Sequence, residues 1–66
     1  MEFHEKLQEL RKSRGLTQEE LAEALFVSRT AISKWESGTS DPSTSNLFAL
    51  AKLYGISVEE LLKEVE

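Results

Sequence analysis

The sequence predicts an all-α fold, a compact domain of five short helices, and three kinds of observation support this prediction. Apolar residues recur every three or four positions, which is the spacing of a helix with one buried face. Serine or threonine stands before four of these segments, and glycine follows three of them. No segment has the pattern of a strand. We therefore expect a single domain over residues 1–66.

The first two helices are predicted at residues 2–14 and 18–25. Gly15 follows the first helix, as glycine often does just past a helix end. Thr17 and Glu20 have the spacing of a capping box, in which each side chain bonds the backbone N–H of the other residue, so they mark the start of the second helix. The expected apolar faces are Phe3, Leu7 and Leu10 in the first helix, and Leu21, Ala22 and Leu25 in the second.

The remaining helices are predicted from the same signals. Ser28 caps a helix at residues 29–37, and Ser43 caps a helix at residues 44–54. A last helix begins after Ser57, with a second capping box expected between this serine and Glu60. The residues expected to face the core are Ile32 and Trp35, then Leu47, Leu50, Ala51 and Tyr54, and in the last helix Val58, Leu61, Leu62 and Val65.

The connection after the second helix is unusual, because Phe26 stands where three other helix ends have glycine. The chain must turn there within a few residues, a position that favours positive φ and costs other residues about 1 kcal/mol or more. Two interpretations remain open. Either the ring recovers this cost by packing on a neighbouring part of the chain, or it faces a partner chain or DNA.

Residues 17–37 have the organisation of a helix-turn-helix unit, with the small Ala22 where the second of its helices must cross the first closely. Such a unit holds its second helix so that the outer face can enter the major groove of DNA. At about 100° per residue, Ile32 points inward and Thr30, Ser33, Lys34 and Ser37 point outward. The expected base contacts are Arg29, Thr30, Ser33 and Lys34. A merely solvated helix face is the alternative.

The flanks of this unit contain candidates for phosphate contact. Thr17 and Gln18 stand at a helix start, where N–H groups and the positive end of the helix dipole attract anions. Hydroxyl residues follow the third helix, although an ordinary polar loop would contain them too. The predicted phosphate contacts are Thr17, Gln18, Ser28, Thr39, Ser40 and Ser43.

Two charged residues are placed beside apolar helix faces. Arg11 follows Leu7 by four residues, and Glu36 follows Ile32 by four. Because a charge that faces a core needs a partner, we expect Arg11 and Glu36 to form an ion pair between the first and third helices. The alternative is two independent surface charges.

Composition limits the function classes. The net charge of -4 argues against a nucleic-acid partner, but residues 24–35 contain Arg29 and Lys34 and no acid, so a local positive region is compatible with a negative total. No cysteine is present, His4 is isolated, and no apolar run approaches the ~20 residues of a membrane span. We expect a cytoplasmic, non-enzymatic protein without cofactor, metal or small-molecule effector.

The last helix has more apolar residues than a solvated terminal helix needs. A core of this size rarely supplies more than roughly 3–5 kcal/mol, so association of two copies is a plausible source of further stability. Val58, Leu62 and Val65 are the candidates for a homodimer contact. They could equally serve only to close the core of the monomer.

Nearly the whole chain resembles the Cro and phage-repressor type helix-turn-helix family of bacterial and phage regulators. The matching residues are Leu16-Thr17-Gln18, Leu21-Ala22, Val27-Ser28, Ile32-Ser33, Glu36-x-Gly38, Pro42-Ser43 and Gly55-Ile56-Ser57. The resemblance implies a lambda-repressor-like five-helix domain that binds pseudo-palindromic operator DNA, usually as a dimer. It also implies Gln18 on phosphate, an Arg11 to Glu36 bridge, and Arg29, Thr30 and Lys34 in the groove. Phe26 departs from the family, which most often has glycine there.

The functional prediction is therefore a sequence-specific, DNA-binding transcriptional regulator, with repression as the expected mode and residues 28–37 as the reading helix. The alternative is a protein-interaction module, such as an adaptor or the antitoxin of a toxin pair, on the same fold. The negative net charge favours this alternative slightly.

Overall fold

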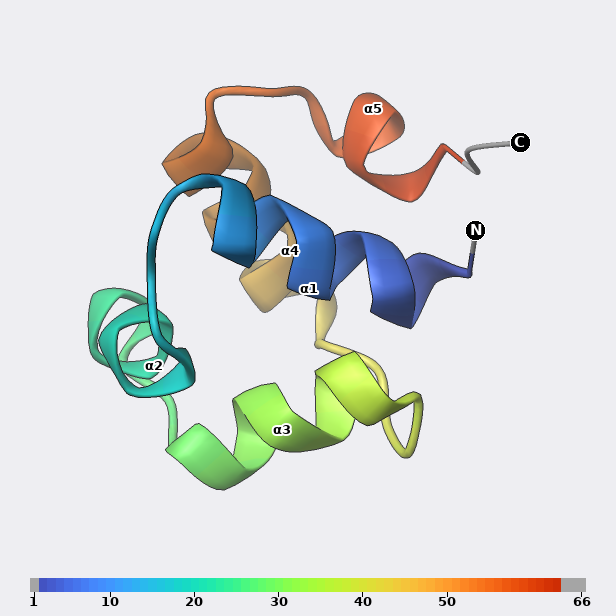
Figure 1. Ribbon diagram of the computed structural model, residues 1–66. Coiled ribbons are helices and arrows are strands. Elements are labelled where there is room, and N and C mark those ends of the chain that lie inside the picture. Colours follow the sequence, from blue (N-terminus) through green and yellow to red (C-terminus); the bar gives the residue numbers. More distant parts are fainter. Residues whose placement is uncertain (1, 64–66) are drawn as a thin grey trace.

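The structure is a computed structural model that describes residues 2–63, and these residues form five helices (Figure 1). The helices are α1 Phe3–Ser13, α2 Gln18–Leu25, α3 Arg29–Ser37, α4 Thr44–Tyr54 and α5 Val58–Leu62. The predicted all-α fold is confirmed, and the bounds of the first four helices agree with the prediction to within one residue. Val65, which we expected in the last helix, lies outside the described residues.

Hydroxyl side chains cap the starts of α2, α3, α4 and α5. Thr17 Oγ1 accepts a hydrogen bond from the backbone N–H of Glu20 at 3.0 Å, and Thr17 N–H donates to the Glu20 carboxylate at 2.9 Å, so the capping box of α2 is complete. Ser28, Ser43 and Ser57 each accept from the backbone N–H three residues later. The second predicted capping box is only half formed. The Ser57 hydroxyl accepts from the backbone N–H of Glu60, but the Glu60 carboxylate does not accept from the backbone N–H of Ser57.

All five helices contribute to one core. In Figure 1, α1 crosses in front of α4 at the centre, with α2 to one side, α3 below and α5 above. Ile32 of α3 and Leu61 of α5 are completely buried. The other buried apolar residues are Leu7, Leu21, Ala22, Leu25, Trp35, Leu50, Ala51 and Tyr54. Within the part of the chain that the structure describes, no helix is both long and apolar enough to span a bilayer.

The packing of α3 determines which of its faces is exposed. Ile32 and Trp35 are buried against the core, and α3 packs on both α1 and α2. Ala22 of α2 is buried, and its small side chain suits the close crossing of these two helices. The opposite face of α3 is therefore held at the surface by a rigid support.

Phe26 ends α2 in the left-handed conformation, with φ 58° and ψ 42°. It is the one non-glycine residue of positive φ among residues 2–63, which confirms the expected turn geometry. However, 95% of the residue is exposed, so the interpretation that the ring recovers its cost by packing was wrong. The physical reason is that Val27 turns inward, donates its N–H to the carbonyl of Ala22 at 3.0 Å and packs on the core, which leaves the preceding ring outside.

We predict that Phe26→Gly stabilises the fold by about 1 kcal/mol, because glycine adopts this conformation without steric cost and no burial is lost. Chemical denaturation followed by circular dichroism measures the change. Gly15→Ala is the matched control: Gly15 has φ +68° and open space around a Cβ, so the substitution should cost about 1 kcal/mol through the backbone alone. A destabilised Phe26→Gly variant would mean that the ring contributes to the fold.

Candidate nucleic-acid interface

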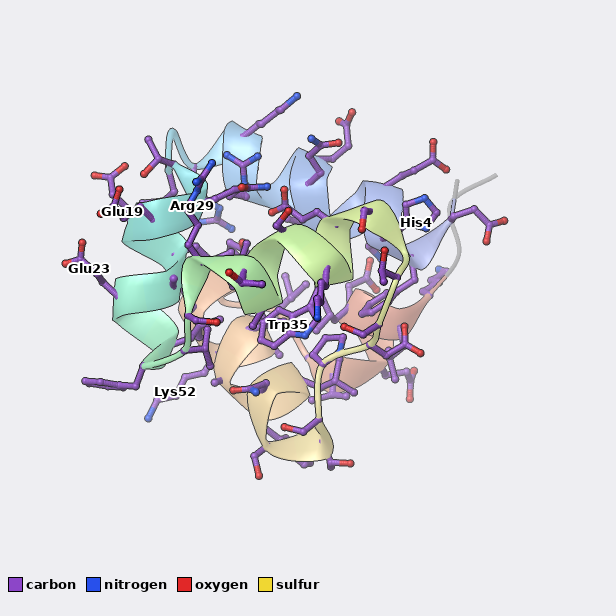
Figure 2. The ribbon with its side chains drawn as sticks, turned by 90° about the horizontal axis from the view of Figure 1, so that it is seen from below. His4, Glu19, Glu23, Arg29, Trp35 and Lys52 are labelled. Atoms are coloured by element: carbon purple, nitrogen blue, oxygen red, sulfur yellow. The ribbon has the colours of Figure 1, made fainter. Side chains whose placement is uncertain are left out.

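The outer face of α3 forms a shallow hollow. Figure 2 views the molecule from the side on which α3 lies. The residues that line the hollow are all exposed, and none is acidic: Arg29, Thr30, Ser33, Lys34, Ser37 and Thr39. The structure thus brings together all four predicted base-contact residues. Ser37 was placed on this face by the helical period but was not predicted as a contact.

The hydroxyl and N–H groups after α3 are already partly engaged. The backbone N–H groups of Thr39 and Ser40 both donate to the carbonyl of Lys34, at 3.0 and 3.3 Å. The hydroxyls of Ser37 and Thr39 lie 2.8 Å apart. A phosphate at this end of α3 would therefore meet side-chain hydroxyls more readily than the N–H groups of Thr39 and Ser40.

Gly38 terminates α3 at φ +82°, a conformation that L side chains rarely adopt. A Cβ at this position would also lie only 3.1 Å from Nδ1 of His4, because the imidazole ring of this α1 residue lies beside the end of α3. The backbone conformation favours glycine here, and any other residue would also require the His4 ring to shift by a few tenths of an ångström.

A second hollow lies at the start of α2. It is lined by Arg11, Gly15, Leu16, Thr17, Gln18, Glu19 and Arg29. The Thr17 hydroxyl accepts the capping bond described above, and its own proton remains available to a phosphate oxygen. Arg29 lines both hollows, so its guanidinium group can serve the base-reading face or the flanking phosphate position.

Glu19 is an acid within this second hollow, at the same edge of the molecule as Arg29 (Figure 2). The sequence explained Glu19 only as a helix-start residue whose charge suits the positive end of the dipole. Its position adds a second effect, because a carboxylate beside a phosphate site repels the phosphate. The sequence pattern contained no sign of this placement.

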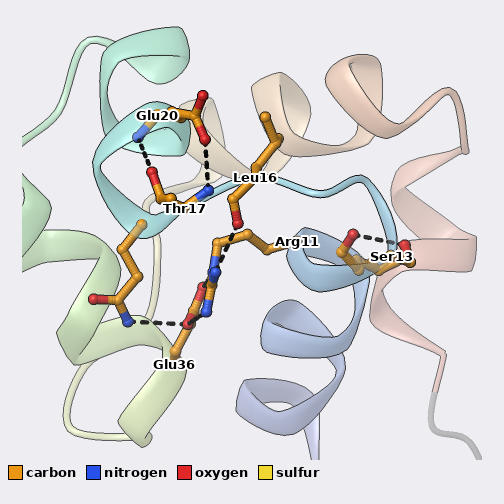
Figure 3. Close-up of polar contacts among 8 residues, drawn as sticks. Arg11, Ser13, Leu16, Thr17, Glu20 and Glu36 are labelled. Carbon is orange, nitrogen blue, oxygen red and sulfur yellow. Dashed lines mark hydrogen bonds and ion pairs between the residues drawn. The ribbon is translucent and has the colours of Figure 1, made fainter.

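The expected ion pair between Arg11 and Glu36 is present and buried (Figure 3). Arg11 donates to both carboxylate oxygens of Glu36, from Nε at 2.8 Å and from Nη2 at 3.1 Å. Its third donor, Nη1, bonds the carbonyl of Leu16 at 2.8 Å. The hydrogen bond with Glu36 raises the pKa of Arg11 despite the opposing effect of burial, so the guanidinium remains charged.

Gln18 joins this pair, which the sequence did not predict. Its Nε2 donates to Glu36 Oε1 at 3.1 Å, so the carboxylate accepts three hydrogen bonds from two helices. The second N–H of the same amide remains available. The buried ion pair thus holds the Gln18 side chain at the start of α2, where a phosphate contact was predicted.

Tyr54 lies near the same charges. Burial, reinforced by the negative charge of Glu36, raises the pKa of its phenol to about 12. Its hydroxyl has no hydrogen-bond partner among the described residues. Arg14 lies over the Tyr54 ring, with its guanidinium carbon 5.8 Å from the ring centroid, and bonds the Tyr54 carbonyl at 2.6 Å. These contacts hold α4 against the end of α1.

The fold defines a helix-turn-helix domain in which α2 and α3 are the two helices of the motif and the outer face of α3 is exposed. The helix-turn-helix family model HTH_3 matches residues 7–61, and the chain belongs to this family. The predicted resemblance to Cro and phage-repressor type proteins is confirmed by this match and by the similarity to a phage repressor given next.

Three known proteins illustrate the similarity. The chain is 54% identical to the transcriptional activator BcrR of Enterococcus faecalis over 66 residues, which is all of this chain and 32% of that protein. It is 36% identical to the cryptic phage CTXphi transcriptional repressor RstR of Vibrio cholerae, over 97% of this chain and 58% of that protein. The P22 c2 repressor, solved in complex with a synthetic operator, has a TM-score of 0.88 and 35% identity over 96% of both chains. The chain thus spans between 32% and 58% of these two curated relatives.

We predict that Arg11 and Glu36 are energetically coupled. Removing either partner from a buried pair leaves an uncompensated charge, so Arg11→Met or Glu36→Gln should each cost about 3 kcal/mol, while the double variant should cost less than their sum. A double-mutant cycle by urea unfolding measures the coupling. Gln18→Ala, which removes one bond to the same carboxylate, is the milder comparison at about 1 kcal/mol. A coupling energy near zero would contradict the assignment.

We predict that Glu19→Gln strengthens DNA binding on all sequences alike. Removing the carboxylate from the second hollow should raise affinity about two- to fivefold, which corresponds to the roughly 0.3–1 kcal/mol of a charge at a helix terminus. The gain should shrink at high salt. Fluorescence anisotropy across a salt series measures it, and Glu9→Gln, an exposed acid on α1 outside both hollows, is the control.

Proposed function

We propose that the protein is a sequence-specific DNA-binding transcriptional regulator that reads operator DNA with α3. The observation that carries this proposal is the acid-free outer face of α3, held rigidly on the core of a protein whose net charge is -4. Membership of the helix-turn-helix family supports it. So does the similarity to the P22 c2 repressor, which was solved on an operator.

In this proposal the residues divide into two groups. Thr30, Ser33 and Lys34 read base edges in the major groove, which is about 12 Å wide and admits one helix. Lys34 can donate to guanine, and the threonine methyl group can contact thymine. Arg29 serves a base or a phosphate, since it lines both hollows.

The second group positions the domain on the DNA backbone. Thr17, Gln18 and Ser28 contact phosphate near the start of α3, and Thr39, Ser40 and Ser43 contact phosphate after its end. Contacts at both ends fix the register of the helix in the groove without carrying sequence information themselves. The network from Arg11 through Glu36 to Gln18 gives one of these contacts a fixed position.

The working form is proposed to be a homodimer that contacts its partner through α5. Leu62 is 48% exposed, whereas Val58 is partly buried and packs on the core, so Leu62 is the stronger candidate of the two. Val65 remains a candidate from the sequence alone. A two-fold dimer would bind a pseudo-palindromic operator whose half-sites lie about 34–36 Å apart, one turn of DNA.

In this proposal the protein acts in the cytoplasm, bound to bacterial or phage DNA, without enzymatic activity or a cofactor. Repression, by occupation of a promoter, is the proposed mode. One of the relatives similar to this chain is named an activator and another a repressor. The position of the operator relative to the promoter would therefore decide the sign of regulation, and a reporter gene with the operator placed upstream or downstream of the start site measures it.

Selection from random DNA tests the function directly. We expect a pseudo-palindromic site to be enriched and to retain its preference at physiological salt, where purely electrostatic binding is weak. Enrichment of no sequence would overturn the proposal. It would then favour the protein-interaction module on the same fold.

We predict different effects for base and phosphate contacts. Thr30→Ala and Lys34→Ala should each lose about 1–3 kcal/mol on the selected site and relax the preference at particular base positions. Gln18→Ala should weaken binding to all sequences by a similar factor and leave the salt slope unchanged, because glutamine is uncharged. Binding to single-base variants over a salt series measures both effects.

The charge-matched control for Lys34→Ala is Lys63→Ala. Lys63 is exposed and follows α5, which lies on the opposite side of the molecule from α3 (Figure 1). This control should leave preference unchanged. If Thr30→Ala and Lys34→Ala lower affinity uniformly, α3 is not the reading element.

A further inference from the structure

An exposed apolar surface lies between the end of α2 and the side of α4. A shallow groove there is lined by Ala24, Leu25, Phe26, Ala49, Lys52 and Leu53, which together we name the Phe26 surface. Phe26 and Leu53 are 95% and 41% exposed. The Phe26 surface shares no residue with the two hollows of the candidate DNA interface.

Phe26 combines two unfavourable features that are independent of each other. Its backbone adopts a conformation that costs a non-glycine residue about 1 kcal/mol or more, and its ring contributes almost nothing to the core. A phenylalanine ring can bury about 150–250 Å² against a partner, so one ring can supply most of the apolar area of a small contact. Because the strained backbone of Phe26 is not compensated by packing of its ring in the monomer, the residue points to a contact outside the monomer.

Charge complementarity indicates which partner fits. Glu23 of α2 and Lys52 of α4 lie at the same edge of the molecule (Figure 2). Both are exposed, and neither side chain forms an ion pair or hydrogen bond within residues 2–63. A two-fold contact between identical surfaces is reciprocal: if one residue of the first copy meets a second residue of the other copy, that second residue of the first copy also meets the first residue of the other. A two-fold axis near Phe26 can therefore set Glu23 against Lys52 twice, with the two rings between them.

We propose that a second copy of this chain docks on the Phe26 surface through this self-complementary contact. The surface lies at the α2 side of the molecule, opposite α5 (Figure 1). If α5 forms the dimer, as proposed above, the Phe26 surface joins protomers of neighbouring dimers. That placement rests on the proposed function.

The size of the contact explains how it would act. One ring and five flanking residues bury less than the about 1,200–2,000 Å² of a stable interface, so two free copies associate only weakly. On two adjacent operators the copies are already held together, and the high effective concentration makes the same weak contact effective. The Phe26 surface thus makes the filling of adjacent operators cooperative.

The first test compares DNA carrying one selected operator with DNA carrying two, spaced by whole helical turns. We expect the wild-type protein to fill paired sites at least about tenfold more tightly than single sites. Phe26→Gly should remove this gain and keep the affinity for one site. Leu62→Ser, which removes an exposed apolar residue of α5, is the matched control and should weaken the single site.

The second test exchanges the charges. Glu23→Lys sets lysine against lysine and Lys52→Glu sets glutamate against glutamate, so each variant alone should lose cooperativity. The double variant should regain it. An equal mixture of the two single variants should also regain it, because every contact between unlike copies pairs lysine with glutamate on both sides. If neither the double variant nor the mixture of single variants regains cooperativity, the proposal is overturned.

The contact can be tested even if no operator is selected and the proposed function fails. Sedimentation of the two charge variants at millimolar concentration should then show association beyond any α5 dimer in the mixture, and no such further association in either variant alone. Equal behaviour of all three samples would overturn the proposal. So would a Phe26→Gly variant that stays cooperative but alters transcription with purified RNA polymerase, since the surface would then bind the polymerase.

Discussion

The ion pair between Arg11 and Glu36 is the contact on which the rest of the structure depends. It joins α1 to α3, and through the carbonyl of Leu16 and the amide of Gln18 it also fixes the start of α2. A buried ion pair need not add net stability, because desolvation can exceed the electrostatic gain, and an apolar pair could fill the same volume. An apolar pair could not hold Gln18 in place. The ion pair therefore serves mainly to orient the Gln18 side chain and the start of α2.

The two faces of α3 separate stability from recognition. Ile32 and Trp35 hold the helix on the core, and the polar residues between them project outward. The acids of the chain lie mostly elsewhere, and a net charge of -4 weakens the sequence-independent attraction to phosphate. This loss falls on every DNA sequence equally. If α3 reads bases as proposed, direct base contacts supply a larger share of the total affinity, which favours discrimination between sites over tight binding to all of them.

Local signals account for what could be predicted from the sequence. Each capping residue acts on a backbone N–H three positions away, so helix starts at Thr17 or Ser28 do not depend on the rest of the fold. The Arg11 to Glu36 pair was predictable because each charge follows a core residue by one helical turn. The outward position of the proposed base contacts followed from the same period.

The remaining features arise only when separate elements meet. The bond from Gln18 to Glu36 joins the start of α2 to the end of α3, and Glu19 lines the hollow beside Arg29; no sequence period relates these positions. The turn at Phe26 was predictable from its place in the chain, but the direction of its ring depended on Val27 taking the inward position.

The exposure of the proposed reading face of α3 has a consequence for how new specificities would arise. Thr30, Ser33 and Lys34 are all exposed, and their side chains form no hydrogen bond or ion pair with the rest of the described chain. Substitutions at these positions should therefore change which operator is preferred at little expense to folding, as is usual for surface sites. An evolving lineage could explore new operators by single mutations at these positions and keep a folded protein throughout.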